Sequence, residues 1–242
     1  MSDSGNSVHN LQEDIIEGLS IASPLSIKER LYFWAKRFIS KMYIEAPLGE
    51  GVNAPRFRAD GFDCMTYVET CLALAISELP EEVIGNLDRI RYINGEIGFH
   101  TRCHFVSADW LPNNKSLLKR RDEIADETVT RVIDRGKFFA EKGFSLPDDH
   151  PLAQPEKVTM PFASKKAVLS MENESVGSSV ALFVADSNWL IVKHVGLVFI
   201  EAGEKELYHC SSKAKKVVRE PLNGYITVRE DIIGTIFLSL VD

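Results

Sequence analysis

The sequence predicts an α+β fold in which helices come first along the chain and strands follow. Apolar residues recur at helical spacing in the first half, which predicts helices over 11–20, 24–43, 64–79 and 80–93. From residue 177 onward, β-rich runs alternate with turn signals, which predicts strands at 178–186, 189–200, 206–212 and 234–241. This order is typical of a domain built around an antiparallel sheet.

The remaining segments are predicted as a tail and loops. The polar residues 1–10 are expected to be disordered, so that 11–242 form one domain with a helical N-terminal part. A loop rich in glycine and proline leads to Asp63. Residues 94–117 combine polar and aromatic groups and are interpreted as an ordered functional loop with a short helix. Residues 122–146 are compatible with either a strand or a helix.

Composition excludes some classes of protein. A chain of 242 residues that is 45% hydrophobic can bury one ordinary core. The net charge of −7 and the pI near 5.5 argue against a nucleic-acid partner. No apolar run approaches the ~20 residues of a membrane span. We therefore expect no nucleic-acid partner, no membrane span and a monomer.

Cys64 begins the helix predicted over 64–79, directly after Asp63, which is a natural N-cap residue. Free backbone N–H groups and the positive end of the helix dipole gather at that point, and both favour a thiolate. The position therefore predicts an accessible, low-pKa nucleophile, although a small buried hydrophobic residue is the alternative. Cys71, which lies among leucines in the middle of the helix, is predicted to be core.

A thiolate nucleophile needs a base and a group that orients the base. His194 lies within an apolar strand, where a face shared with Leu190, Val192, Gly196 and Val198 is expected. A four-residue loop over 201–204 would pair Ile200 with Lys205 and place His209 on the His194 face. Because Gly196 has no side chain, the two imidazoles would have room to meet diagonally.

These residues resemble a known family. The motifs "DCMTYVE" (63–69), "HVGL" (194–197) and "HCSS" (209–212) are similar to the cysteine, histidine and third-residue motifs of the NlpC-type papain-like cell-wall hydrolases. The motifs "RIRYINGEI", "RCHF" and "ADWLPNN" narrow the match to a subfamily described as N-acetylmuramoyl-L-alanine amidase-like. The resemblance covers residues from about 57 to 228. The sequence departs from the family pattern at Gly177-Ser178, at Cys210 and at its last strand.

The resemblance implies a papain-like fold in which a cysteine-bearing helix packs on an antiparallel sheet that carries both histidines. It implies that Cys64 is the nucleophile, His194 the general base and His209 the residue that orients His194. The implied reaction is hydrolysis of the N-acetylmuramoyl–L-alanine amide bond of peptidoglycan or its muropeptide fragments, with no cofactor and no metal.

Three other functions stay open. The same fold could cut the bond between D-glutamate and the diamino acid of the stem peptide. Cys64, His194, His209 and Cys210 could bind a metal, although their spacing matches no zinc pattern. A non-catalytic binding module is the third alternative.

A second group of polar residues is predicted to contact the substrate. Arg102 could bind a stem-peptide carboxylate and Trp110 could stack on a sugar ring. The group also contains His104, Asp109, Asn114 and, one helical turn from Cys64, Tyr67. The alternative is a loop held by its own hydrogen bonds. Glu69 is expected at the surface or behind the site.

The expected substrate points to the bacterial cell envelope or periplasm. The polar beginning of the sequence has no apolar signal-peptide core. A cytoplasmic or delivered protein therefore remains an alternative.

Overall fold

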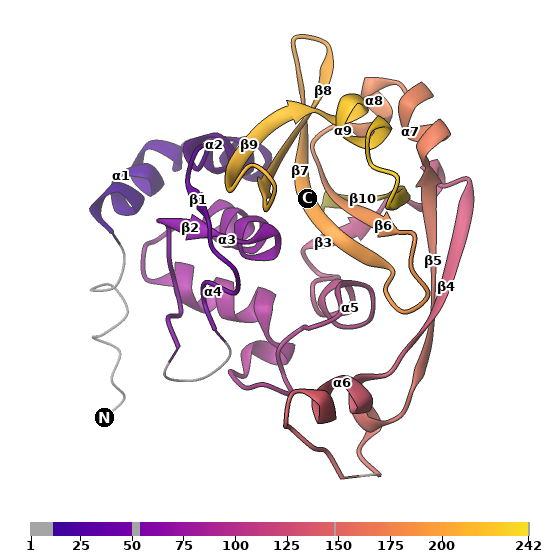
Figure 1. The fold of residues 1–242 in the computed structure, drawn as a ribbon. Helices are drawn as coiled ribbons and strands as arrows, with labels where there is room; N and C mark the ends of the chain where they lie inside the picture. Colours follow the sequence, from indigo (N-terminus) through magenta and orange to yellow (C-terminus); the bar gives the residue numbers. More distant parts are fainter. Residues whose placement is uncertain (1–11, 50–53, 148, 242) are drawn as a thin grey trace, which may run out of the picture.

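The computed structural model of this protein describes residues 12–49, 54–147 and 149–241. A curled, mostly antiparallel sheet runs through the molecule, and helices cover both of its faces (Figure 1). The α+β prediction is therefore confirmed. The predicted disordered tail, residues 1–10, lies outside the described residues.

The sheet has the strand order β2-β1-β9-β8-β7-β6-β10-β5-β4, and β3 pairs with β10. All neighbouring strands are antiparallel except β1 and β2, which are parallel. The strands are β1 (Met42–Tyr43), β2 (Gly61–Phe62), β3 (Leu118–Arg120), β4 (Glu127–Ile133), β5 (Glu156–Ser164), β6 (Ser179–Ala185), β7 (Val192–Glu201), β8 (Glu204–Ser211), β9 (Lys216–Pro221) and β10 (Ile232–Leu240).

The α-helices are α1 (Glu13–Ala22), α2 (Ile27–Arg37), α3 (Cys64–Ile76), α4 (Glu82–Arg91), α5 (Leu111–Asn113), α6 (Arg135–Glu141), α7 (Lys165–Ser170), α8 (Asn173–Val176) and α9 (Leu222–Thr227). A π-helical turn, Val106–Trp110, precedes α5 in the predicted functional loop. None of the helices in the described parts of the chain is both long and apolar enough to cross a membrane.

Two boundaries differ from the prediction. The helix expected over 24–43 ends at Arg37, and Ser40 then adopts a φ of 71°, which breaks the helix before strand β1. The segment 122–146, predicted as either a strand or a helix, contains one of each, because strand β4 is followed at once by helix α6. Asp134 separates the two and caps α6 by accepting a hydrogen bond from the Lys137 N–H at 2.8 Å.

Helix α3 is buried on almost every side. Asp63 and Thr66 form a capping box at its first turn, where the Asp63 carboxylate accepts a hydrogen bond from the Thr66 N–H at 2.7 Å. The helix packs against α2 and α4 on one side and against β7 and β8 on the other. The larger core forms around α3, whereas a smaller core lies under α7, α8 and α9 on the opposite face of the sheet.

The β7–β8 hairpin has the predicted register, with Ile200 opposite Lys205. The turn itself is shorter than expected, because Ala202 and Gly203 alone connect the strands, both with positive φ. The register still agrees because Glu201 and Glu204, counted in the predicted loop, form the last pair of the ladder.

A β-bulge in β7 changes which residues share a face with His194. His194 pairs with Phe183, but Val192 pairs with Val184, so Lys193 is the extra residue. Val192 therefore faces the core around α3, whereas Val198 lies in the core on the His194 side. The expectation that Val192 shares the His194 face is wrong, because a strict two-residue period does not continue through a bulge.

Candidate functional site

Cys64 lies where strands β7 and β8 separate. At the end far from the turn, their ladder stops at the pair of Leu197 with Tyr208. Beyond it, the chain leading into α3 approaches both strands. Cys210 of β8 donates its S–H to the Phe62 carbonyl at 3.0 Å, and the Val195 N–H of β7 lies against the Cys64 sulfur. The nucleophile candidate is therefore held beside the residue that follows His194.

His194 and His209 meet as predicted. The His194 Nε2 and His209 Nδ1 atoms are 2.7 Å apart, with the rings at 89° to each other. Gly196 permits this approach, since a β-carbon at that position would lie 2.7 Å from Leu207 Cδ1 and 3.1 Å from His209 Cβ. On its far side, His209 Nε2 lies 2.8 Å from Glu220 Oε1. The sequence motifs did not predict Glu220 as a neighbour of this pair.

Aromatic rings hold the two imidazoles in place. Phe183 stacks on His194, with ring centroids 5.8 Å apart. Tyr225 of α9 contacts both imidazoles, with centroids 6.0 Å from His194 and 5.0 Å from His209. His209 is 2% exposed, whereas His194 keeps some exposed surface. Rotation of either ring is therefore restricted by packing.

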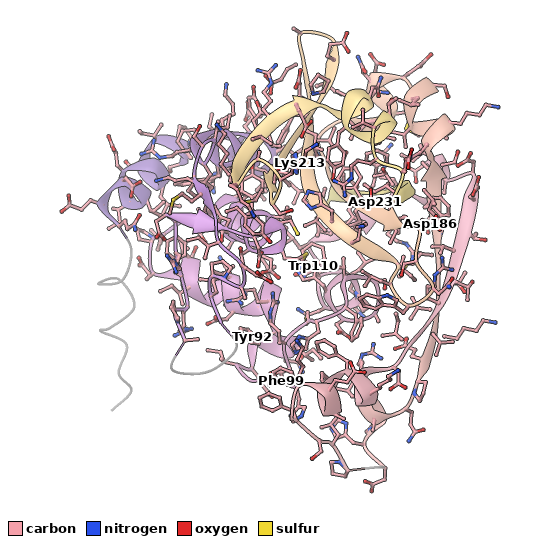
Figure 2. The ribbon with its side chains drawn as sticks, viewed as in Figure 1. Tyr92, Phe99, Trp110, Asp186, Lys213 and Asp231 are labelled. Carbon is pink, nitrogen blue, oxygen red and sulfur yellow. The ribbon has the colours of Figure 1, made fainter. Side chains whose placement is uncertain are left out.

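A charged network lies behind Tyr225. The Tyr225 hydroxyl accepts a hydrogen bond from Arg229 at 2.9 Å, and Arg229 binds both carboxylate oxygens of Asp231. Asp231 also pairs with Lys193, next to His194. Figure 2 shows Asp231 and Asp186 close together, and the Asp186 N–H donates to the Asp231 carbonyl at 3.1 Å. These contacts join the start of β10 to the end of β6 and the start of β7.

The pKa of Cys64 differs from the prediction. Burial, with a smaller contribution from the Asp63 carboxylate, raises the pKa of the Cys64 thiol to about 12. The backbone N–H groups of Val195, Met65 and Cys64 lower it, as expected at a helix start, but they do not outweigh burial. The expectation of a low-pKa thiol is therefore wrong, because the sequence did not show how deeply the strands cover the helix start.

The pKa of His194 is held well below its ordinary value. Burial is the main cause, and His209, Arg229 and Lys193 add to it. The two shifts favour a neutral Cys64 thiol and a neutral His194 imidazole rather than a thiolate and an imidazolium. A proton can move from sulfur to nitrogen only when another charge change, such as attack on a carbonyl, accompanies the transfer.

Tyr43 is a further site neighbour that sequence reasoning missed. It lies on β1 and keeps some exposed surface. Burial raises the pKa of Tyr43, and the nearby Cys64 and Asp63 raise it further. Its hydroxyl therefore remains a hydrogen-bond donor at neutral pH, close to the candidate nucleophile. The prediction of a helix through residue 43 concealed this position.

The structure places Arg102 in a buried ion cluster. Glu69 is fully buried and contacts Arg102 at 3.1 Å and Arg91 at 3.4 Å. Both guanidinium groups lie over the ring of Tyr92, labelled in Figure 2. Glu69 therefore does not lie at the surface, and its place behind the site stays a prediction. Arg102 thus already has a carboxylate partner within the protein.

The other predicted substrate contacts point inward. Trp110 and Tyr67 have no exposed surface, and the Tyr67 hydroxyl donates to the Ala35 carbonyl at 3.1 Å. The Asn114 amide donates to two backbone carbonyls, and His104 Nε2 lies 2.8 Å from the Phe99 carbonyl. Trp110 and Asn114 thus pack inside the loop, His104 is bonded to the loop but keeps some exposed surface, and Tyr67 holds α3 against α2.

Asp109 holds the same loop to α6. Its carboxylate accepts hydrogen bonds from the Phe105 N–H at 2.8 Å and from Arg135 at 2.6 Å. Asp109 and Arg135 are both buried, so this is an interior ion pair. The structure therefore brings His194 and His209 together and places the Cys64 sulfur against the Val195 N–H, next to His194 in the chain, whereas Asp109 is engaged in the internal contacts of the loop.

Among the described residues, no group of three His, Cys, Asp or Glu side chains is arranged to hold a metal ion. All four cysteines are free. The functional groups gathered in the described residues are the Cys64 thiol, the His194 and His209 imidazoles and the Glu220 carboxylate.

A family model described as AmiA-like, N-acetylmuramoyl-L-alanine amidase-like, matches residues 31–234. The chain belongs to this family. The matched range includes Cys64, His194, His209 and Glu220. No curated protein matches the chain.

Solved structures share the fold of this family member. A protein of Legionella pneumophila has a TM-score of 0.83 at 22% identity, and the match covers 99% of this chain and 97% of that one. A protein of Bacteroides uniformis named N-acetylmuramoyl-L-alanine amidase has a TM-score of 0.73 at 20% identity, covering 89% and 99%. A putative xylanase of Bacteroides fragilis has a TM-score of 0.67 at 21% identity, covering 85% and 98%. At these identities the likeness establishes the fold.

Alkylation of Cys64 should accelerate steeply with pH. Because the pKa of its thiol is raised to about 12, the thiolate fraction should grow about tenfold per pH unit. The rate of Cys64 modification by iodoacetamide, followed by peptide mass spectrometry, should rise roughly 100-fold between pH 7 and pH 9. Cys71 should react more slowly throughout because it is fully buried. A rate that is high and flat across this range would instead indicate a thiolate–imidazolium pair.

Replacement of Glu69 should strongly destabilise the protein. Glu69→Gln would leave Arg91 and Arg102 buried without their carboxylate, and breaking a buried pair in this way costs about 3–5 kcal/mol. The free energy of unfolding in urea measures the loss. Asp60→Asn is the matched control, since its ion pair with Arg58 is largely exposed and should contribute about 0–1 kcal/mol. Equal costs for the two variants would contradict the role of the buried cluster.

Proposed function

We propose that this protein is an NlpC-type, papain-like cysteine amidase that hydrolyses the N-acetylmuramoyl–L-alanine bond of peptidoglycan or its fragments. The supporting observation is the His194–His209 pair, 2.7 Å apart, whose His194 lies on the strand that places the Val195 N–H against the Cys64 sulfur. In a chain of the amidase-like family, a thiol beside a paired imidazole is a nucleophile with its base. The substrate places the proposed site of action in the bacterial cell envelope.

The first half of the reaction forms a thioester. As the Cys64 sulfur attacks the lactyl carbonyl carbon, its proton passes to the free nitrogen of His194. His194 then gives this proton to the nitrogen of L-alanine, the C–N bond breaks, and the stem peptide leaves as an amine. His209 holds the His194 ring so that the free nitrogen keeps its direction through both transfers.

The second half releases the sugar acid. His194 takes a proton from water as the water oxygen attacks the thioester carbonyl, and the C–S bond then breaks. The proton returns to the sulfur, so the thiol and neutral imidazole of the resting site are restored. Water is the only co-reactant that this cycle needs.

The oxyanion would form at the start of α3. The Cys64 and Met65 N–H groups already lie against the sulfur, where they would be near a tetrahedral centre bonded to it. The positive end of the α3 dipole favours negative charge at the same point. Tyr43 supplies a neutral hydroxyl donor on the open side, and we propose it as the additional donor that stabilises the oxyanion.

The loop residues are proposed to shape the substrate cleft. Arg102, Asp109 and Asn114 are each bonded within the protein, so their contribution would be to hold the loop in position. His104 and Trp110 would act in the same way, whereas Tyr67 would hold α3 against α2 through its bond to Ala35. Direct contact between the five loop side chains and the substrate would require the loop to open.

Cleavage of a defined muropeptide tests the proposal. Product masses should show free N-acetylmuramic acid–containing sugar and an intact stem peptide with a new L-alanine amine. Cys64→Ala and His194→Ala should each lower kcat by several powers of ten, because nucleophile and base act as one unit. His209→Asn should keep measurable activity, since its amide oxygen can accept the His194 proton.

Two results would contradict this assignment. Product masses that place the cut between D-glutamate and the diamino acid would show that the enzyme is a stem-peptide endopeptidase, with the same cysteine mechanism acting on a different bond. Full activity of folded Cys64→Ala would exclude the cysteine mechanism.

The pH dependence of kcat/KM should be unusually broad. The active form has a neutral thiol and a neutral imidazole. The His194 pKa lies well below the ordinary 6.5, and the Cys64 pKa is raised to about 12. Protonation of His194 should therefore abolish activity only on the acid side of pH 6.5, and kcat/KM should stay flat from pH 7 to pH 9. An acid limb near pH 6.5 or above would contradict the depressed His194 pKa.

A further inference from the structure

We propose that Glu220 is a positioning residue that sets the tautomers of both histidines, leaving His194 Nδ1 unprotonated. The statement about tautomers stands on geometry alone, whereas its consequence for catalysis rests on the proposed cysteine amidase function. Nothing in the sequence motifs points to Glu220, which lies eleven residues beyond His209 on a strand that was not predicted.

The geometry forms a continuous line of polar atoms. Glu220 lies on β9 opposite Leu207, so it is a diagonal neighbour of His209 on β8. Its Oε1 atom lies 2.8 Å from His209 Nε2, and His209 Nδ1 lies 2.7 Å from His194 Nε2. His209 is 2% exposed, while the Glu220 side chain is 41% exposed. The line therefore runs from solvent, through a buried imidazole, to the proposed base.

Two neutral imidazoles can share one hydrogen bond in two ways. In the first arrangement, His194 Nε2–H donates to His209 Nδ1, and His194 Nδ1 carries a free lone pair. In the second, His209 Nδ1–H donates to His194 Nε2, so the His194 proton sits on Nδ1. Only the first arrangement lets His194 Nδ1 accept a proton from a thiol. A histidine in the orienting position can therefore either donate to His194 Nε2 or accept from it, whereas an asparagine oxygen can only accept.

Glu220 removes this ambiguity for a pair of neutral imidazoles. An ionised carboxylate can only accept hydrogen bonds, so it requires a proton on His209 Nε2. A neutral His209 protonated there has a bare Nδ1, which must accept from His194 Nε2–H. The pKa of Glu220 is lowered chiefly by its bond to His209, so the carboxylate is ionised at neutral pH. In the second arrangement, the His209 Nε2 lone pair would face this negative charge.

A double-mutant cycle tests whether Glu220 acts through His209. Glu220→Ala should lower kcat about ten- to a hundredfold with little change in KM, because it removes a positioning contact and no substrate contact. In the His209→Asn background, the same substitution should have no further effect, since the amide does not reach through to position 220. Glu206→Ala is the matched control, because it removes a carboxylate from the same β8–β9 pair, where Glu206 binds Arg219 and not His209.

The tautomers can be read without substrate. Long-range ¹H–¹⁵N correlation spectra of the imidazoles at pH 8, above the ordinary histidine pKa, should show His194 and His209 both protonated at Nε2. In Glu220→Ala, His194 should gain Nδ1–H character, whereas in Glu206→Ala it should not. Glu220→Gln should give an intermediate spectrum, because its amide can accept or donate.

The outcomes separate this inference from the proposed function. Nδ1–H on His194 in the unmodified protein, or an unchanged spectrum in Glu220→Ala, would overturn the role of Glu220 whatever the activity. An equal loss of kcat in the His209→Asn background would also overturn it. If the spectra show the predicted tautomers but the protein cleaves no muropeptide, the role of Glu220 is supported and only the amidase function is rejected.

Discussion

The 2.7 Å contact between His194 and His209 is the constraint on which the arrangement of strands β7, β8 and β9 depends. Cross-strand imidazoles on one face approach this closely only if the intervening position carries no side chain, and Gly196 meets that condition. The two-residue turn at Ala202 and Gly203 sets the register that places them diagonally. The same register brings β9 and Glu220 to the far side of His209.

The burial that orders this site also suppresses its charges. Packing of Phe183 and Tyr225 on His194 keeps its imidazole neutral, and the strands over Cys64 keep its thiol protonated. In such a site the resting cysteine is a protonated thiol and not a thiolate. In the proposed mechanism the thiol proton therefore moves in the same step as the attack, so the direction of the His194 lone pair matters more than the acidity of the thiol.

The sequence predicted the parts of the site that local pattern encodes. Asp63 before an apolar helix predicts the cap and the position of Cys64, and turn length predicts the His194–His209 pairing. The pattern could not reveal Glu220, because β9 is a short run, KVVREP, whose charged residues and final proline do not follow the two-residue period of a strand. Nor could it reveal the pKa of Cys64, which depends on strands more than 100 residues away, as the contact of Cys210 with Phe62 illustrates.

Helix α3 links the proposed chemistry to the loop that follows α4. Cys64 lies at its first position, and Glu69 lies on the same helix, where it binds Arg102 of the loop. Fully buried ion pairs stabilise little in net terms, since desolvation offsets most of their attraction, but they tolerate no shift in geometry. The Glu69 carboxylate therefore ties the position of the loop to the helix that carries Cys64. Any substrate that displaces the loop must also work against the helix that carries Cys64.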